Sequence, residues 1–179
     1  MVLKRPQPIG VCLFALTCLL ICTSSQAANG QGRGRARSSE TPSRIVAGTA
    51  VDGEIDTGTL RAALEALPRR PERIAVVDDE AVSPALEKQR RDLDAFVPGG
   101  SRVIYLRRQS VTLIAAEYSG GPYVLMLAAV IWHEMAHTEG LDERHARDRE
   151  EDLWKEFVQR GLVDSGVGLT YLDQLRRRR

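Results

Sequence analysis

The apolar residues of the chain follow helical spacing in some segments and form strand-like runs in others. A first predicted helix ends at Pro68 and carries four apolar residues on one face: Leu60, Ala63, Leu64 and Leu67. Short runs rich in β-branched residues predict strands at 73–77 and 102–107. Residues 45–55 suggest a short strand without deciding it, and residues 111–117 suit a strand or a helix equally well.

Two longer helices are predicted at 124–137 and 141–161. The first is nearly all apolar, so we expect it to be buried, and Gly140 ends it. The second has an apolar face among alternating acids and bases, and a short turn should pack it back antiparallel against the first. A further helix is predicted to begin near Ser83 and to end before Pro98. Together these elements predict an α+β domain with a short sheet around a buried helix.

The N-terminal residues 1–27 have the pattern of a signal peptide. Lys4 and Arg5 precede an apolar run at 11–21, and small residues suited to cleavage follow that run. We therefore expect the mature protein to be secreted or periplasmic. The alternative is a membrane anchor formed by residues 9–23, for which the apolar run is short.

The remaining chain divides by composition. Residues 28–44 are rich in Gly, Ser and Arg and predict a disordered linker, residues 45–175 predict the folded domain, and residues 176–179 form a basic tail. All three cysteines lie in the predicted signal peptide, so the mature chain would have no thiol ligand or disulfide. Removing Lys4 and Arg5 changes the formal charge from +1 to −1, which gives no argument for nucleic-acid binding. Membrane contact is expected only through an uncleaved N-terminal segment or the basic tail.

All three histidines of the chain lie within residues 133–145. His133, Glu134 and His137 form the pattern H-E-x-x-H on the predicted apolar helix. His133 and His137 are neighbours on one helical face, with Cβ atoms about 5–6 Å apart. Their ring nitrogens can converge on one zinc ion, and Glu134 can reach a water in an open coordination position. The pattern predicts a catalytic site with one zinc per chain.

A catalytic zinc generally has three protein ligands, so a third ligand should lie near the two histidines. If residues 142–160 fold back antiparallel, the metal lies level with Ala146, and Glu143 and Glu150 flank that alanine at helical spacing. Glu143 is our first choice for the third ligand and Glu150 is the second. His145 points to a different face and is expected at the surface.

The H-E-x-x-H pattern followed by an acidic residue on the next helix resembles the gluzincin branch of zinc metallopeptidases. Glu143-x-x-Ala146 is similar to the glutamate-x-x-alanine element of many gluzincins. Gly140, three residues after His137, also resembles the metzincin pattern, although Glu143 stands in the place of its third histidine and no clear Met-turn is present. The resemblance covers residues 101–158. It implies a small zincin-like α+β domain with a short sheet, a buried H-E-x-x-H helix and a following antiparallel helix.

The resemblance also implies hydrolysis of peptide bonds by a zinc-bound water that Glu134 activates as general base. Extended substrate should pair with a strand beside the site, and the candidate residues are Arg102, Val103, Ile104, Tyr105 and Leu106. Three tyrosines are candidates for stabilising the oxyanion, or else packing residues: Tyr105, Tyr118 and Tyr123. The expected partner is a peptide or protein substrate.

Our first interpretation is therefore an exported zinc-dependent metallopeptidase. The alternative is a non-enzymatic zinc-binding module with the same fold, which would serve envelope assembly or partner binding. Glu134 favours the enzyme, because a module that only holds metal has no need of a base there. A third reading treats the pattern as an accident in an ordinary core helix. Peptide deformylases resemble the motif but use a cysteine ligand, which the expected mature chain lacks.

Overall fold

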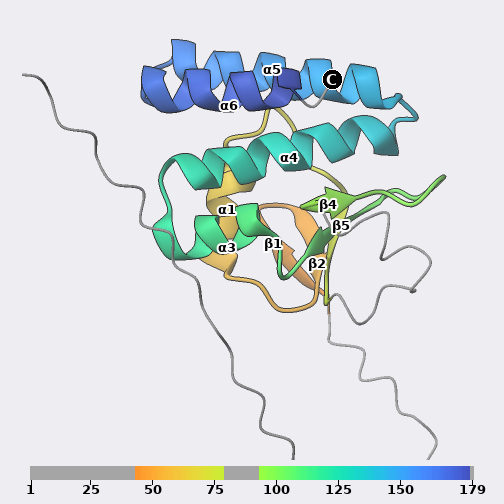
Figure 1. The fold of residues 1–179 in the computed structure, drawn as a ribbon. Coiled ribbons are helices and arrows are strands. Elements are labelled where there is room, and N and C mark those ends of the chain that lie inside the picture. Colours follow the sequence, from red (N-terminus) through yellow and green to blue (C-terminus); the bar gives the residue numbers. More distant parts are fainter. Residues whose placement is uncertain (1–42, 79–92, 178–179) are drawn as a thin grey trace, which may run out of the picture. The chain divides into compact units, whose positions relative to one another are not determined.

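The computed structural model describes residues 43–78 and 93–177 (Figure 1). All described residues belong to one compact unit, Ser39–Arg179. Its described residues form a small mixed sheet and five helices in an α+β fold, which confirms the predicted class. None of the helices in the described part of the chain is long and apolar enough to cross a membrane.

Five strands form one sheet in the order β1-β2-β3-β5-β4: β1 Arg44–Val46, β2 Thr49–Asp52, β3 Arg73–Val77, β4 Ala95–Phe96 and β5 Val103–Arg107. The three inner strands are parallel, whereas each edge strand runs antiparallel to its neighbour. Val51, Ile74 and Ile104 lie in one row across the parallel strands, and all three are fully buried. This apolar row forms part of the hydrophobic core that the sheet shares with the helices.

Helix α4 is the centre of the packing. The described helices are α1 Thr57–Glu65, α3 Val111–Ser119, α4 Pro122–Thr138, α5 Glu143–Gln159 and α6 Ser165–Arg177. Helix α4 contacts α1, α3, β4 and β5, and its other side packs against α5, which in turn contacts α6 (Figure 1). Leu127, Ala128 and Ile131 of α4 are almost completely buried. A helix surrounded in this way must be apolar around most of its circumference, as its sequence is.

Helices α5 and α6 approach closely because α6 carries a glycine at the contact. The indole nitrogen of Trp154 donates a hydrogen bond of 2.9 Å to the carbonyl oxygen of Gly168. A Cβ atom on Gly168 would lie 2.4 Å from Cγ2 of Val158 on α5. The buried ring of Trp154 also lies against Tyr171 of α6, with ring centroids 4.4 Å apart. These contacts fix the C-terminal helix beside α5.

The long predicted helices and the strand at 73–77 are confirmed, and the two undecided segments are resolved. Residues 45–55 contain the hairpin of β1 and β2, which turns at Ala47 and Gly48 with positive φ at both residues. Residues 111–117 are helical, since α3 covers them and Ser110 caps it by accepting a hydrogen bond from the backbone N–H of Leu113. The cap supplies the local preference that the apolar pattern left undecided.

Three predicted boundaries differ from the bounds of the observed strands and helices. Arg44 belongs to β1, so the folded chain begins inside the predicted linker at 28–44. The basic tail at 176–179 is helical where it is described, because α6 extends to Arg177 and Arg176 contacts Glu151. The predicted helix from Ser83 to Pro98 does not extend to its expected end: Ala95–Phe96 pairs with β5 and is buried there. Its residues 83–92, the predicted signal peptide and linker residues 28–42 lie outside the described residues.

Replacing Gly168 by Ala should destabilise the protein by about 1–3 kcal/mol, because the new methyl group overpacks the contact between α5 and α6. Urea denaturation of the two proteins measures this change. Gly58→Ala is the matched control, since Gly58 is also helical and a Cβ there meets only ordinary contacts with Asp56. Equal loss of stability in both variants would contradict the proposed close contact.

Candidate metal centre

The turn between α4 and α5 brings Glu143, the candidate third ligand, close to the two histidines. Helix α4 ends in a Schellman motif, in which the N–H of Gly140 bonds to the carbonyl of His137 and the N–H of Leu141 bonds to that of Ala136. Gly140 has φ +82°, a conformation that glycine adopts without strain. Asp142 then caps α5, so Glu143 is the first residue of the new helix.

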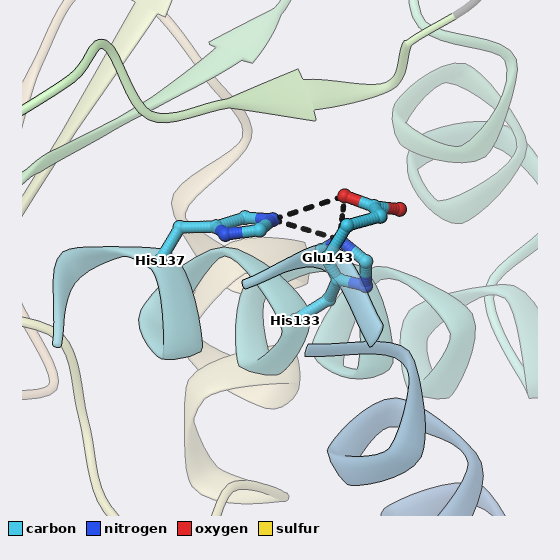
Figure 2. Close-up of side chains that lie close together, drawn as sticks. All are labelled: His133, His137 and Glu143. Carbon is cyan, nitrogen blue, oxygen red and sulfur yellow. Dashed lines mark hydrogen bonds and ion pairs between the residues drawn. The ribbon is translucent and has the colours of Figure 1, made fainter. Parts of the chain in front are cut away.

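His133, His137 and Glu143 direct one atom each toward a common point (Figure 2). The two Nε2 atoms are 3.2 Å apart, and Oε2 of Glu143 lies 3.6 Å from that of His133 and 3.3 Å from that of His137. Ligands about 2.0–2.1 Å from a tetrahedral zinc ion are about 3.3 Å from one another. The three residues therefore fit one face of a tetrahedral coordination sphere and could hold a metal ion.

The hydrogen bonds on the far side of each ring orient the lone pairs toward this point. Nδ1 of His137 lies 3.0 Å from the carbonyl oxygen of Leu141, which can only accept, so Nδ1 carries the proton. Nδ1 of His133 lies 2.9 Å from Oε2 of Glu150 and donates to that carboxylate. In the neutral tautomers both Nε2 atoms are then acceptors, and they face a third acceptor on Glu143. Three converging acceptors require a shared proton or a cation among them.

Glu150 supports His133 rather than joining the three converging atoms. Its side chain is 8% exposed, and its second oxygen, Oε1, accepts a hydrogen bond of 2.6 Å from the hydroxyl of Tyr171 on α6. The chain from Tyr171 through Glu150 to His133 is the carboxylate–histidine arrangement that fixes ring orientation in metal sites. Of the two predicted candidates for third ligand, the geometry therefore favours Glu143.

Charge and burial shift the pKa values of His133 and Glu143. Burial lowers the pKa of His133, but the hydrogen bond and charge of Glu150, with the charges of Glu134 and Glu143, outweigh it and raise the pKa. For Glu143, burial raises the pKa, yet the charge of His133 and the ion pair with Arg147 leave it lowered. Glu143 is thus an anion at neutral pH, as a ligand carboxylate must be.

Glu134 is buried next to the two histidines, with a relative exposure of 7%. Burial raises the pKa of its carboxyl group, more than the charges of His133 and His137 lower it. It faces the same cavity of about 430 Å³ as His133 and Glu143. A carboxylate whose pKa is raised in this way is a stronger base than an ordinary glutamate.

The cavity at His133, Glu134 and Glu143 is bounded in part by the edge strand β4. Ala95 of this strand lines it, together with Leu93 and Asp94. The Glu143 side chain is 55% exposed, whereas the His133 side chain is 13% exposed. A ligand can therefore reach the Glu143 carboxylate from solvent.

The predicted substrate strand does not lie at this edge. The strand β5 is paired with β3 along its length, and Tyr105 and Leu106 are also paired with β4 on the other side. Arg102 is outside the strand, in an exposed ion pair with Glu72. None of the five predicted residues, Arg102, Val103, Ile104, Tyr105 and Leu106, is among the described residues that line the cavity. The strand β4 was not predicted from the sequence, because its two residues lie in a segment whose apolar residues have helical spacing.

The remaining candidates are placed apart from the converging atoms. His145 is at the surface, as predicted, where its Nδ1 lies 2.7 Å from Oδ1 of Asp142. Tyr105 stacks on Phe96, and Tyr118 is 86% exposed. Sequence reasoning missed Arg147 and Tyr171 as partners of Glu143 and Glu150. Arg147 follows Glu143 by four residues on α5, a spacing that signals such an ion pair.

Comparison of the chain with protein-family models, with curated proteins and with solved structures gives no match.

Glu150→Gln should weaken metal binding at the three converging atoms by about 10–100-fold, because the charge that orients and polarises His133 is removed. Tyr171→Phe should have a smaller effect, since it removes only one hydrogen bond from Glu150. Competition with a chromophoric chelator measures both affinities. Glu156→Gln is the control on the same helix, where the carboxylate is exposed and pairs with Arg160. An unchanged affinity in Glu150→Gln would contradict the supporting role.

Stability of the metal-free protein should fall as the pH rises above 6.5, the ordinary pKa of histidine. His133 has a raised pKa in the folded state, so its contribution is complete below the unfolded value and is lost as the pH rises through the folded value. Urea denaturation of chelator-treated protein between about pH 6 and about pH 8 measures the loss. Glu150→Gln should reduce this loss of stability. Parallel profiles of stability against pH for the wild-type protein and the variant would show that Glu150 does not raise the pKa of His133.

Proposed function

We propose that this protein is a zinc-dependent metallopeptidase of the zincin type. The observation that carries the proposal is the convergence of three metal-binding acceptors beside a buried carboxyl group. His133, His137 and Glu143 form the converging set, and Glu134 faces the same cavity. A structural metal site needs no open position and no adjacent base, whereas a hydrolytic site needs both.

The ligand set favours zinc over other metals. Two imidazole nitrogens and one carboxylate oxygen are the ligands of several catalytic zinc sites, in which a water or substrate completes the tetrahedron. Magnesium and calcium prefer sites built from oxygen atoms. Imidazole ligands also suit copper, iron and nickel, so the support for zinc comes from the near-tetrahedral spacing of the three atoms.

Zinc, when bound, would lower the pKa of a water in its open position and polarise the scissile carbonyl group. Glu134 would take a proton from that water and return it to the leaving amine. Glu150 and the carbonyl of Leu141 hold the two imidazole rings in position. Arg147 keeps Glu143 ionised and restrains its carboxylate through Oε1, leaving Oε2 for the metal.

The strand β4 is the better candidate for pairing with an extended substrate. It is an edge strand, and Ala95 lines the metal-site cavity. The outer edge of such a strand can add a peptide by backbone hydrogen bonds. This assignment replaces the residues 102–106 proposed from the sequence.

Glu134→Gln should keep one zinc per chain and lose about 10²–10⁴-fold in kcat, because only the base is removed. Cleavage of a mixed peptide library, read by mass spectrometry, and elemental analysis of the same samples provide the two measurements. Glu143→Ala should instead lose the metal, and Glu156→Gln should change neither.

The outcomes separate the enzyme from the alternatives. Full activity in Glu134→Gln would exclude Glu134 as the base. Stoichiometric zinc without cleavage by the wild-type protein would favour a zinc-binding module. Folded wild-type protein that binds no zinc would leave the motif as part of an ordinary core helix.

A further inference from the structure

A second cavity adjoins the candidate metal centre. It has a volume of about 800 Å³ and lies between α3, the first half of α4 and α6. Asp94 and Val130 line both this cavity and the smaller one at His133. The two cavities therefore share walls, and we call the larger one the α4 groove.

The α4 groove extends along one face of α4 away from the metal-binding histidines. Tyr123, Met126 and Val130 line it, and their spacing places them on the helical face that continues to His133 and Glu134. His133 follows Tyr123 by ten positions, which correspond to about 15 Å along the helix axis. An extended peptide spans that distance with about four or five residues, at about 3.3 Å per residue.

The walls of the α4 groove present apolar side chains to solvent. Val111 is 80% exposed, Tyr123 is 40% exposed and Val167 is 37% exposed, although all three line the groove. Apolar side chains gathered around a cavity in this way indicate a binding surface.

The polar groups of the groove walls are largely engaged within the protein. The carboxylate of Asp94 accepts hydrogen bonds from the backbone N–H and the hydroxyl of Thr112. Asp164 accepts a hydrogen bond from the N–H of Gly166, and the Thr170 hydroxyl donates to the carbonyl of the same glycine. What remains for an occupant is mainly apolar contact.

The charge of the groove walls disfavours acidic occupants. Asp94 and Asp164 are acidic, and no basic residue is among the described residues that line the groove. The adjoining metal-site cavity carries three more carboxyl groups and one arginine. Acidic side chains in the groove would therefore meet like charge.

We propose that the α4 groove binds the chain of the substrate on one side of the scissile bond, over about four or five residues with neutral, apolar side chains. This inference rests on the proposed peptidase function, since continuity with the metal-site cavity is what identifies the occupant as substrate. It makes the protein an endopeptidase that selects apolar segments: short peptides reach the catalytic groups but leave the groove empty.

Two exposed apolar residues of α6 provide a matched pair of variants. Val167 lines the groove, whereas Leu169 is 65% exposed and is not among the lining residues. Either can be replaced by Asp near the start of the helix, where an acid is tolerated. Val167→Asp puts a charge into the groove, and Leu169→Asp adds the same charge outside it.

Peptide binding can be measured independently of cleavage in zinc-loaded Glu134→Gln protein. The probe is a fluorescently labelled peptide of about ten residues, made of leucine, alanine and glutamine, and its binding is read by fluorescence anisotropy. We expect Val167→Asp to weaken binding about tenfold and Leu169→Asp to leave it unchanged. Replacing the leucines of the probe by glutamate, or shortening it to about three residues, should also weaken binding at least tenfold.

Cleavage by the wild-type protein and its two α6 variants separates the possible failures. Binding that depends on Val167, without cleavage of any peptide, would sustain the α4 groove and overturn the peptidase function. Cleavage that is equally affected or equally unaffected by the two variants would overturn the groove and sustain the peptidase. No binding of the apolar probe to zinc-loaded Glu134→Gln protein would also overturn the groove.

Discussion

The antiparallel packing of α5 against α4 determines the position of every group at the candidate metal centre. Glu143 and Glu150 lie about one turn on either side of Ala146, which is completely buried. A larger residue at Ala146 would push the helices apart and move both carboxylates away from the histidines. Farther along the same helix, Trp154 and Phe157 are also completely buried and continue the buried face of α5. The apolar core of the domain and the geometry of the site are therefore one packing arrangement.

This packing arrangement brings several negatively charged side chains together, and a bound cation would offset their mutual repulsion. Glu134, Glu143 and Glu150 face one cavity, and Arg147 is the basic residue that lines it. In the metal-free protein, the raised pKa of His133 lets a proton supply part of the missing positive charge. A divalent ion at the same point would displace that proton, so metal binding and proton release are coupled. The hydrogen bond from Tyr171 extends the coupling to α6, the helix that also forms one wall of the α4 groove.

The parts of the fold that the sequence predicted are those decided by local pattern. The long apolar helix, its amphipathic successor and the strand at 73–77 have periodicities that tertiary contacts did not override. The proximity of Glu143 to the histidines was also predictable, because helical spacing and a short turn leave few acidic residues of α5 that can lie level with them. Two features depended on contacts distant in sequence. Ala95–Phe96 is a strand only because β5 lies beside it, and the partner of the second oxygen of Glu150 is Tyr171, which comes from α6. The turn at Ala47 lacks the Asn or Asp that usually marks such a hairpin.

We propose that His133, His137 and Glu143 together hold one zinc ion. X-ray absorption spectroscopy of the zinc-loaded protein tests it most directly, because the method counts imidazole ligands and measures their distances. We expect two imidazole nitrogens and additional oxygen scattering at about 2.0–2.1 Å, with no sulfur. In Glu143→Ala the affinity for zinc should fall, and any zinc that stays bound should keep its two imidazole ligands. A spectrum with fewer than two imidazoles, or folded protein without stoichiometric zinc, would contradict the account.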